Sequence, residues 1–173
     1  MVSPLHEVLV ELFQRSPGLL RPLVGRRVRA LSRTRLGLRT DHTRVTELRL
    51  ADSDLVLLVR SRGKLVCAIV FEVQLAIDRR KARTWPLYAA WVHQRLGCPV
   101  HVVVLAVNQR VAAWAAGPFG SGDLSLQTCV IGPEHIPPIT DAGVARANVE
   151  LAFLSALAHS REPIALEIAR GDG

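Results

Sequence analysis

The sequence has few aromatic residues, few cysteines and no long apolar run. Aromatic side chains make up 5% of the 173 residues, and the three cysteines, Cys67, Cys98 and Cys129, are far apart. An odd number of thiols in apolar surroundings favours reduced core cysteines over a disulfide framework or a zinc site. The apolar runs are far shorter than the roughly 20 residues that span a bilayer, and no signal peptide is recognised. We therefore expect a cytoplasmic protein without a membrane segment.

Acidic residues are absent from residues 21–39, although this stretch is rich in arginine and the chain carries a formal net charge of +7. The arginines are Arg21, Arg26, Arg27, Arg29, Arg33, Arg35 and Arg39. Such clusters attract phosphate backbones of any sequence because binding releases condensed counterions. The alternatives are a solvated basic surface and a contact with membrane phospholipid, but no amphipathic helix with an aromatic anchor accompanies the arginines. A nucleic acid is the favoured partner.

Length and an apolar fraction of 49% fit a single domain over residues 1–160, followed by a loose tail over residues 161–173. Apolar spacing and capping residues predict helices over residues 4–15, 19–28, 79 (or 84)–96, 108–116 and 141–159. Short β-rich runs predict strands over residues 45–50, 54–60, 64–75, 99–107 and 124–131. The first three strands should form an antiparallel meander, and the fourth, which is apolar throughout, should lie in the middle of the sheet. This order predicts a mixed α/β domain.

Polar residues at the ends of two neighbouring predicted strands form the candidate site. Seven apolar residues, Leu65–Phe71, precede Glu72, so a carboxylate follows directly on the buried part of a strand. Side chains alternate along a strand, which puts Gln74 on the same face as Glu72. Asp54 opens the preceding strand, and the hairpin between the two strands should bring it beside Glu72. Two carboxylates, an amide oxygen and the carbonyl of Val73 are ligands of the kind that Mg²⁺ or Mn²⁺ prefers.

The same acids have simpler explanations. Acidic residues are common at strand ends, where water solvates them. A buried carboxylate needs a partner, and Arg79 or Arg80 can serve Glu72 in place of a metal ion. Asp52 lies two residues before Asp54 and on the same strand face, so it is a competing ligand, although the apolar run that follows Asp54 favours Asp54.

The spacing of Asp54 and Glu72-Val73-Gln74, eighteen residues apart, resembles the D…E-x-Q form of the PD-(D/E)XK nuclease motif. The surrounding sequence is similar to a family of small nucleases widespread in actinobacteria, related to the recombination-promoting nuclease and transposase branch of that superfamily. The segments that carry the similarity are Glu72–Leu75, Arg79–Lys81, Trp85–Tyr88, Cys98–Val100, Ala113–Ala116 and Leu151–His159. The resemblance covers about residues 1–160.

The resemblance implies a restriction-endonuclease-like core, with a mixed central sheet flanked by helices, and metal-dependent hydrolysis of phosphodiester bonds in DNA. In that scheme Asp54, Glu72 and the Val73 carbonyl hold Mg²⁺ or Mn²⁺, and Asp54, Glu72 and Gln74 are the catalytic residues. The metal would polarise the scissile phosphate and lower the pKa of an attacking water. Gln74 stands where many members have lysine, and an amide can only orient by hydrogen bonding. The expected enzyme is an endonuclease of a mobile element or of genome defence.

A basic segment follows the candidate site. The residues predicted to contact the DNA backbone are Arg79, Arg80, Lys81, Arg83, Arg26, Arg27 and Arg29. The alternative for the first four is a solvated helix start that pairs with nearby acids. The residues expected in the core or in a dimer contact, in preference to base stacking, are Trp85, Tyr88, Trp91 and Trp114. Two other hypotheses remain: a binding module on the same fold that has lost turnover, and an interaction protein with another acidic partner. A homodimer would fit a nuclease whose sites each cut one strand.

Overall fold

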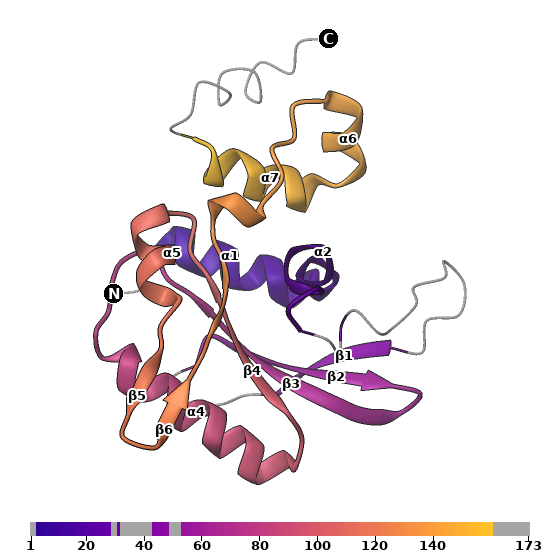
Figure 1. Ribbon diagram of the computed structural model, residues 1–173. Helices are drawn as coiled ribbons and strands as arrows, with labels where there is room; N and C mark the ends of the chain where they lie inside the picture. The colour runs from indigo at the N-terminus through magenta and orange to yellow at the C-terminus, as the bar shows by residue number, and fades with distance from the viewer. Residues whose placement is uncertain (1–2, 29–30, 32–42, 49–52, 161–173) are drawn as a thin grey trace.

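A mixed sheet carries the domain. Its strands are β1 (Thr43–Leu48), β2 (Leu55–Ser61), β3 (Lys64–Val73), β4 (Val100–Leu105) and β7 (Cys129–Ile131), in the order β1-β2-β3-β4-β7. The first three pair antiparallel, whereas β3 with β4 and β4 with β7 are parallel. This computed structural model describes residues 3–28, 31, 43–48 and 53–160 (Figure 1). The predicted meander is confirmed, and β4 lies inside the sheet as expected.

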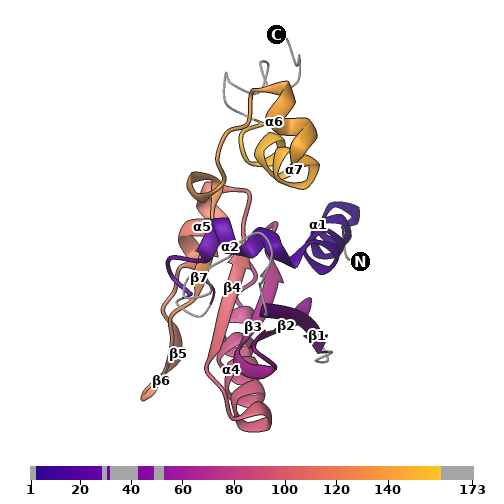
Figure 2. The same cartoon turned by 90° about the vertical axis from the view of Figure 1, so that its right-hand side faces the viewer.

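Helices cover both faces of this sheet. They are α1 (Pro4–Arg15), α2 (Leu20–Val24), α4 (Lys81–Leu96), α5 (Gln109–Ala115), α6 (Ala142–Ala147) and α7 (Val149–Ala158), with single 3-10 turns at η1 (Pro17–Leu19) and η2 (Pro133–His135). Figures 1 and 2 show α1 and α2 on one side of the sheet and α4 on the other. The expected α/β class, with a mixed sheet flanked by helices, is therefore confirmed, and none of the described helices is long and apolar enough to cross a membrane.

Strict alternation along β3 divides the apolar core into two parts. Ile69 and Phe71 belong to the part that packs against α1, α2 and α7, whereas Ala68 and Val70 belong to the part that packs against α4 and α5. Phe13 of α1 stacks on Phe71, with ring centroids 4.4 Å apart. Because β3 is covered on both faces, its apolar run continues without polar interruption up to Glu72, which is itself buried.

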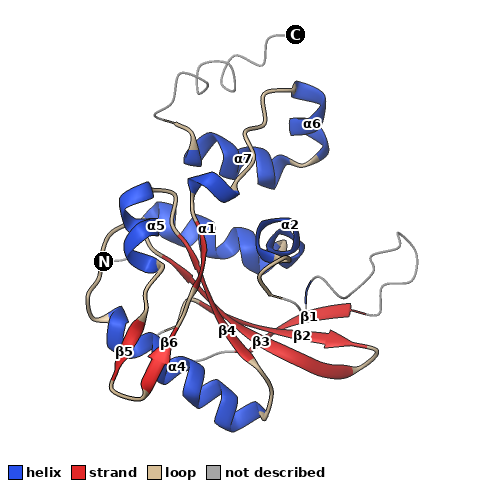
Figure 3. Cartoon of the chain, in the orientation of Figure 1, coloured by secondary structure: helices blue, strands red, loops and turns tan. Residues whose placement is uncertain are grey.

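The hairpin that joins β2 to β3 sets the register of the candidate site. Arg62 and Gly63 both have positive φ, 50° and 79°, which is the backbone of the two-residue turns that match the twist of antiparallel strands (Figure 3). Ser61 then pairs with Lys64, and the ladder runs back to Leu55 opposite Phe71, with one irregularity between Val59 and Arg60. The N-terminal end of β2 therefore lies beside the C-terminal end of β3, as predicted.

Helix boundaries follow local capping chemistry. Ser3 accepts a hydrogen bond from the His6 amide at the start of α1, and Gly97 ends α4 in the left-handed conformation at φ 61°. Asp78, the predicted cap, accepts a hydrogen bond from the Arg80 amide. Helix α4 nevertheless begins at Lys81, whereas a cap at Asp78 implied a start directly after it. Pro86 consequently lies in the second turn of α4.

Two predicted elements were wrong in their boundaries. The stretch 124–131 is not one strand: β6 (Leu124–Leu126) pairs with β5 (Phe119–Ser121) in a small separate sheet, so the predicted loop 117–122 also contains a strand. The predicted helix 141–159 is broken at Asn148, whose side chain accepts from the Leu151 amide and caps α7. The predicted tail, 161–173, lies outside the described residues, as do Arg29, Arg33, Arg35 and Arg39.

All three cysteines are free thiols, and Cys67 and Cys98 are buried, as expected for core residues. Burial, with a smaller effect of Cys98, raises the pKa of Cys67 to about 11. At pH 8 the thiolate fraction should therefore be about a hundredfold lower than for an ordinary cysteine, and access should lower the rate further. We expect Cys67 to react with a thiol reagent only after unfolding, as followed by mass spectrometry of the labelled chain. Labelling of Cys67 at the rate of a free thiol in the native protein would contradict this assignment.

Candidate functional site at the end of strand β3

The C-terminal end of strand β3 carries a fully buried carboxylate. Glu72 exposes 0% of its side chain and lies on the α4 side of the sheet, on the same face as Val70. Its Oε2 is 2.5 Å from Nζ of Lys81, the first residue of α4, whose side chain remains 18% exposed. Its Oε1 has no hydrogen-bond partner among the described residues, and neither has the indole Nε1 of Trp85. One oxygen of a buried carboxylate is thus uncommitted, which needs an explanation.

The ion pair does not fully compensate the burial of Glu72. Desolvation raises the pKa of Glu72 above its ordinary value, Lys81 opposes this, and the negative charge of Asp54 adds to the rise. A weak hydrogen bond from the Trp85 indole is the smallest of the causes that lower the pKa of Glu72, although the indole does not meet the carboxylate in good hydrogen-bond geometry. For Lys81, burial alone would lower the pKa, but Glu72 and Asp54 raise it overall. The lysine therefore stays charged, whereas the glutamate is held in an environment that disfavours its charge.

Asp54 meets the same end of β3 from the neighbouring strand. Its Oδ2 accepts a hydrogen bond from the Val73 amide at 2.7 Å and lies 3.1 Å from Nε2 of His6 on α1. The Asp54 side chain is 15% exposed, so it lies at the edge of the core, between the buried Glu72 and the solvent. Both bonds use one oxygen and orient the carboxylate. Asp54 lies near enough to Glu72 for its negative charge to raise the pKa of that glutamate, while a cation shared by the two carboxylates stays a prediction.

Gln74 follows the strand end at the same place. Its backbone amide donates to the Leu105 carbonyl at 2.8 Å, which continues the parallel pairing with β4, and its side chain is buried. Sequence reasoning expected Arg79 or Arg80 as the non-metal partner of Glu72. This expectation was wrong: Arg80 pairs with Asp78 at 2.9 Å on the surface, Arg79 is exposed, and Lys81 holds Glu72 instead.

Only part of a metal-ligand set is assembled. Among the described residues no group of three His, Cys, Asp or Glu side chains is close enough to hold a metal ion, and Asp52 lies outside those residues. Mg²⁺ is usually bound by one or two carboxylates, with water and substrate phosphate completing its shell, so the two carboxylates fit it. The uncommitted Oε1 of Glu72 supplies a buried acceptor, and Asp54 uses its Oδ2 alone in its two hydrogen bonds. The Val73 carbonyl as a ligand stays a prediction.

The predicted DNA-contacting residues do not form one described surface. Arg79, Arg80 and Arg83 are exposed at the start of α4, next to the candidate site, as is Arg26 at the end of α2. Lys81 points to Glu72 rather than to solvent. Arg27 is engaged differently, because its Nη1 donates to the Val130 carbonyl at 3.1 Å and its guanidinium lowers the pKa of Cys129, against a larger rise caused by burial.

Two contributors to the site were missed by sequence reasoning. His6 is 48 residues from Asp54, and nothing in its helix marks it as a site residue. Lys81 was assigned to DNA contact, although a lysine nine residues after a buried glutamate, at the start of the following helix, is a plausible ion-pair partner. Trp85 was correctly expected in the core, where it packs against Trp114 and Phe119. Trp91 is 41% exposed and therefore lies outside the core, so the dimer contact, which was the other expectation for it, stays a prediction.

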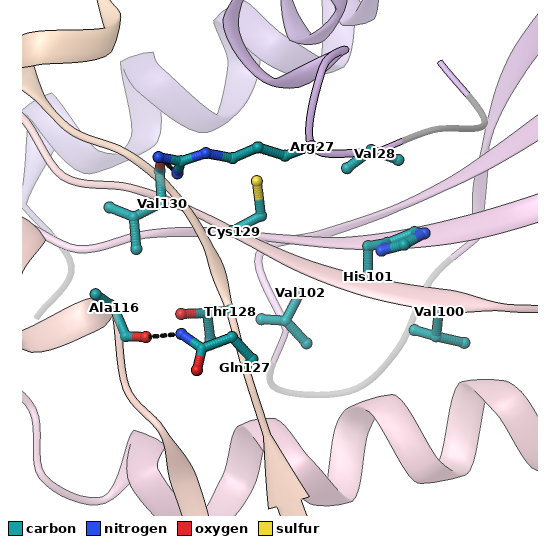
Figure 4. A pocket seen from close by; sticks show the side chains of 10 residues that line it. All are labelled: Arg27, Val28, Val100, His101, Val102, Ala116, Gln127, Thr128, Cys129 and Val130. Atoms are coloured by element: carbon teal, nitrogen blue, oxygen red, sulfur yellow. Dashed lines mark hydrogen bonds between the residues drawn. The ribbon is translucent and has the colours of Figure 1, made fainter. Parts of the chain in front are cut away.

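A pocket of about 470 Å³ lies away from this site, between the end of α2 and strands β4 and β7 (Figure 4). Most of the polar side chains that line this pocket already make hydrogen bonds within the protein. Gln127 donates to the Ala116 carbonyl, Thr128 donates to the Ala115 carbonyl, and Arg27 bonds to β7. His101, which also lines it, has its pKa lowered by burial. Because neither Asp54 nor Glu72 lines this pocket, we assign the candidate chemistry to the end of β3.

Comparisons with protein-family models, with curated protein sequences and with solved structures found no match for this chain. The described geometry is therefore the basis for a functional assignment. It consists of two carboxylates at the end of the central strands, one of them fully buried with an uncommitted oxygen, and a charged lysine beside them.

Proposed function

We propose that this chain is a nuclease of the PD-(D/E)XK type that hydrolyses phosphodiester bonds in DNA with the help of a divalent cation. The observation that carries the proposal is the fully buried Glu72, whose Oε1 has no hydrogen-bond partner among the described residues, next to Asp54. A structural ion pair would be expected to satisfy both oxygens of a buried carboxylate. A site that keeps one oxygen uncommitted, at a cost in stability, is more readily explained by a ligand that binds there.

Four side chains have distinct roles in this proposal. Asp54 and Glu72 hold Mg²⁺ or Mn²⁺, and the bound ion supplies a Lewis acid that polarises the phosphate and acidifies a water. His6 and the Val73 amide fix one oxygen of Asp54, which leaves the other for the ligand. Lys81 brings a positive charge to the phosphate, which is the charge that Gln74 cannot provide.

Exposed arginines beside the site support a polyanionic substrate. Arg79, Arg80 and Arg83 lie at the start of α4, within a few residues of Lys81. Contacts between such side chains and phosphates hold a nucleic acid in place without reading its sequence. The chain as a whole carries a formal charge of +7, which adds to this attraction.

A second candidate function is a nucleic-acid-binding module that has kept the fold but lost turnover. The ion pair between Lys81 and Glu72 favours it, because the lysine neutralises the carboxylate that would hold a cation. Gln74 favours it as well, since an amide cannot stabilise developing negative charge as a lysine does. A test with and without metal ions distinguishes the two functions, because only the nuclease needs a cation for a step that follows the binding of nucleic acid.

The test is incubation of the purified chain with supercoiled plasmid, in Mg²⁺, in Mn²⁺ and in chelator. We expect nicked circles to accumulate with either cation and not with chelator, because the proposed mechanism requires the cation to acidify the attacking water. Agarose electrophoresis of the products measures the rate. Cleavage that continues in chelator would indicate a contaminant or another mechanism, and binding without any cleavage would favour the binding module.

A further inference from the structure

The outer face of α4 carries a line of residues that no core contact explains. Arg83, Leu87, Trp91 and Arg95 are spaced four residues apart and form one stripe along the helix, and the stripe is about 18 Å long. All four are exposed, Leu87 by 60% and Trp91 by 41%, and we call them the α4 stripe. The guanidinium of Arg95 lies over the indole of Trp91, 5.4 Å from the ring centroid. Two apolar side chains thus lie between two cations.

The sequence of α4 and its flanks carries charge of one sign. Between Asp78 and Asp123 the sequence contains no acidic residue, whereas the same stretch carries Arg79, Arg80, Lys81, Arg83, Arg95 and Arg110. Helix α4 lies on the side of the sheet opposite α1, and its start adjoins the candidate site through Lys81 (Figure 2). A polyanion held at the site can therefore continue along this helix, which itself carries no acidic side chain.

The apolar centre of the stripe discriminates between kinds of polyanion. The outside of a duplex presents phosphates and hides the faces of its bases, so Leu87 and Trp91 would gain little from it. Unpaired bases expose their faces, and aromatic side chains between cations are the usual platform for them. We propose that the α4 stripe binds an unpaired nucleic-acid strand, with a base stacked on Trp91 and phosphates near Arg83 and Arg95. The inference rests on the proposed function, because it assigns unpaired strand as part of the substrate of the same site.

The test measures binding separately from cleavage. In chelator, the chain is titrated with an oligothymidine of about 15 nucleotides, and with a duplex of equal length, by fluorescence anisotropy. Trp91→Ala should weaken binding of the oligothymidine about 5- to 100-fold and leave binding of the duplex within about twofold, while Trp91→Phe should retain most of the affinity. Arg83→Gln and Arg95→Gln should each lower the salt dependence by about 0.7 in the logarithmic slope. Because Trp91 is exposed, these variants should fold.

Val149→Ala is the matched control, since Val149 is an apolar residue of α7 that is 65% exposed, and its replacement should leave both affinities unchanged. Equal weakening of duplex and oligothymidine by Trp91→Ala, or no weakening, would overturn the inference. So would a change of oligomeric state in sedimentation without a change in affinity, which would assign the stripe to a contact between protein chains. If plasmid nicking is metal-dependent but Trp91→Ala changes neither affinity, this inference fails and the proposed function stands. Selective oligothymidine binding without any cleavage would support the stripe and reject the nuclease.

Discussion

Replacing Glu72 by glutamine is expected to reduce metal-dependent plasmid nicking by at least about a hundredfold, because loss of a direct metal ligand should cost more than loss of a group that only orients one. The shape of the side chain is kept, so α4 and β3 should stay packed as they are. DNA binding should not weaken, because the substitution removes a negative charge near the phosphates. The measurements are nicking rates at several Mg²⁺ concentrations and anisotropy titrations in chelator.

The same substitution should stabilise the protein at neutral pH, by about 1 kcal/mol. The pKa of Glu72 is raised above its ordinary value of 4.5 in the folded protein. The stability that this group contributes is therefore complete below about that pH and is lost as the pH rises through the folded pKa. Glutamine resembles the protonated form at every pH, so Glu72→Gln should lack this part of the pH dependence. Urea unfolding between pH 4 and pH 8, roughly the range over which the carboxyl group titrates, measures it.

Glu134→Gln provides the matched control for both measurements, because Glu134 is a half-exposed glutamate at η2, outside the candidate site. It should change neither the nicking rate nor the slope of stability with pH. Undiminished nicking by Glu72→Gln would reject the assigned metal site. Lower stability of Glu72→Gln at neutral pH would show instead that the carboxylate is a net structural asset, as in an ordinary buried ion pair.

Replacing Lys81 by methionine is expected to destabilise the protein by about 3 kcal/mol at pH 8, because it leaves a fully buried carboxylate without its counter-charge. The loss should be smaller at pH 5, where Glu72 can take up a proton, its pKa being raised further once Lys81 no longer opposes the desolvation. Methionine keeps the length and the apolar stem of lysine, so packing losses should be small. The free energy of unfolding in urea, measured at both pH values, provides the test.

A double-mutant cycle identifies the origin of the loss. Lys81→Met combined with Glu72→Gln should recover most of the stability, because the charge that needed a partner has been removed. Arg15→Met is the surface control: it breaks the exposed ion pair of Arg15 with Glu11, 2.5 Å apart, and should cost less than about 0.5 kcal/mol. If Lys81→Met were no more costly than Arg15→Met, Glu72 would not depend on Lys81.

Several elements of the fold could be predicted because they depend on neighbours in the sequence. Helix α1 has its cap, its proline and its apolar spacing within residues 3–15, and it was predicted with the observed bounds. The hairpin at Arg62 and Gly63 was predicted from its turn residues, and the register that follows brings Asp54 to Glu72. The prediction of one strand over residues 124–131 was wrong. The chain divides there into β6 and β7 because each pairs with a different sheet, which does not depend on composition.

The sequence by itself determined the α/β class, the meander and the nearness of two acids, because strand alternation and a tight turn act over a few residues. Only the tertiary structure decided the partners of those acids. His6 reaches Asp54 from another helix, and Lys81 rather than an arginine meets Glu72, because the packing of α1 and α4 against opposite faces of β3 sets which side chains arrive there. The uncommitted oxygen of Glu72 and the exposure of Trp91 are likewise results of burial, which depends on contacts between distant segments and not on the order of residues.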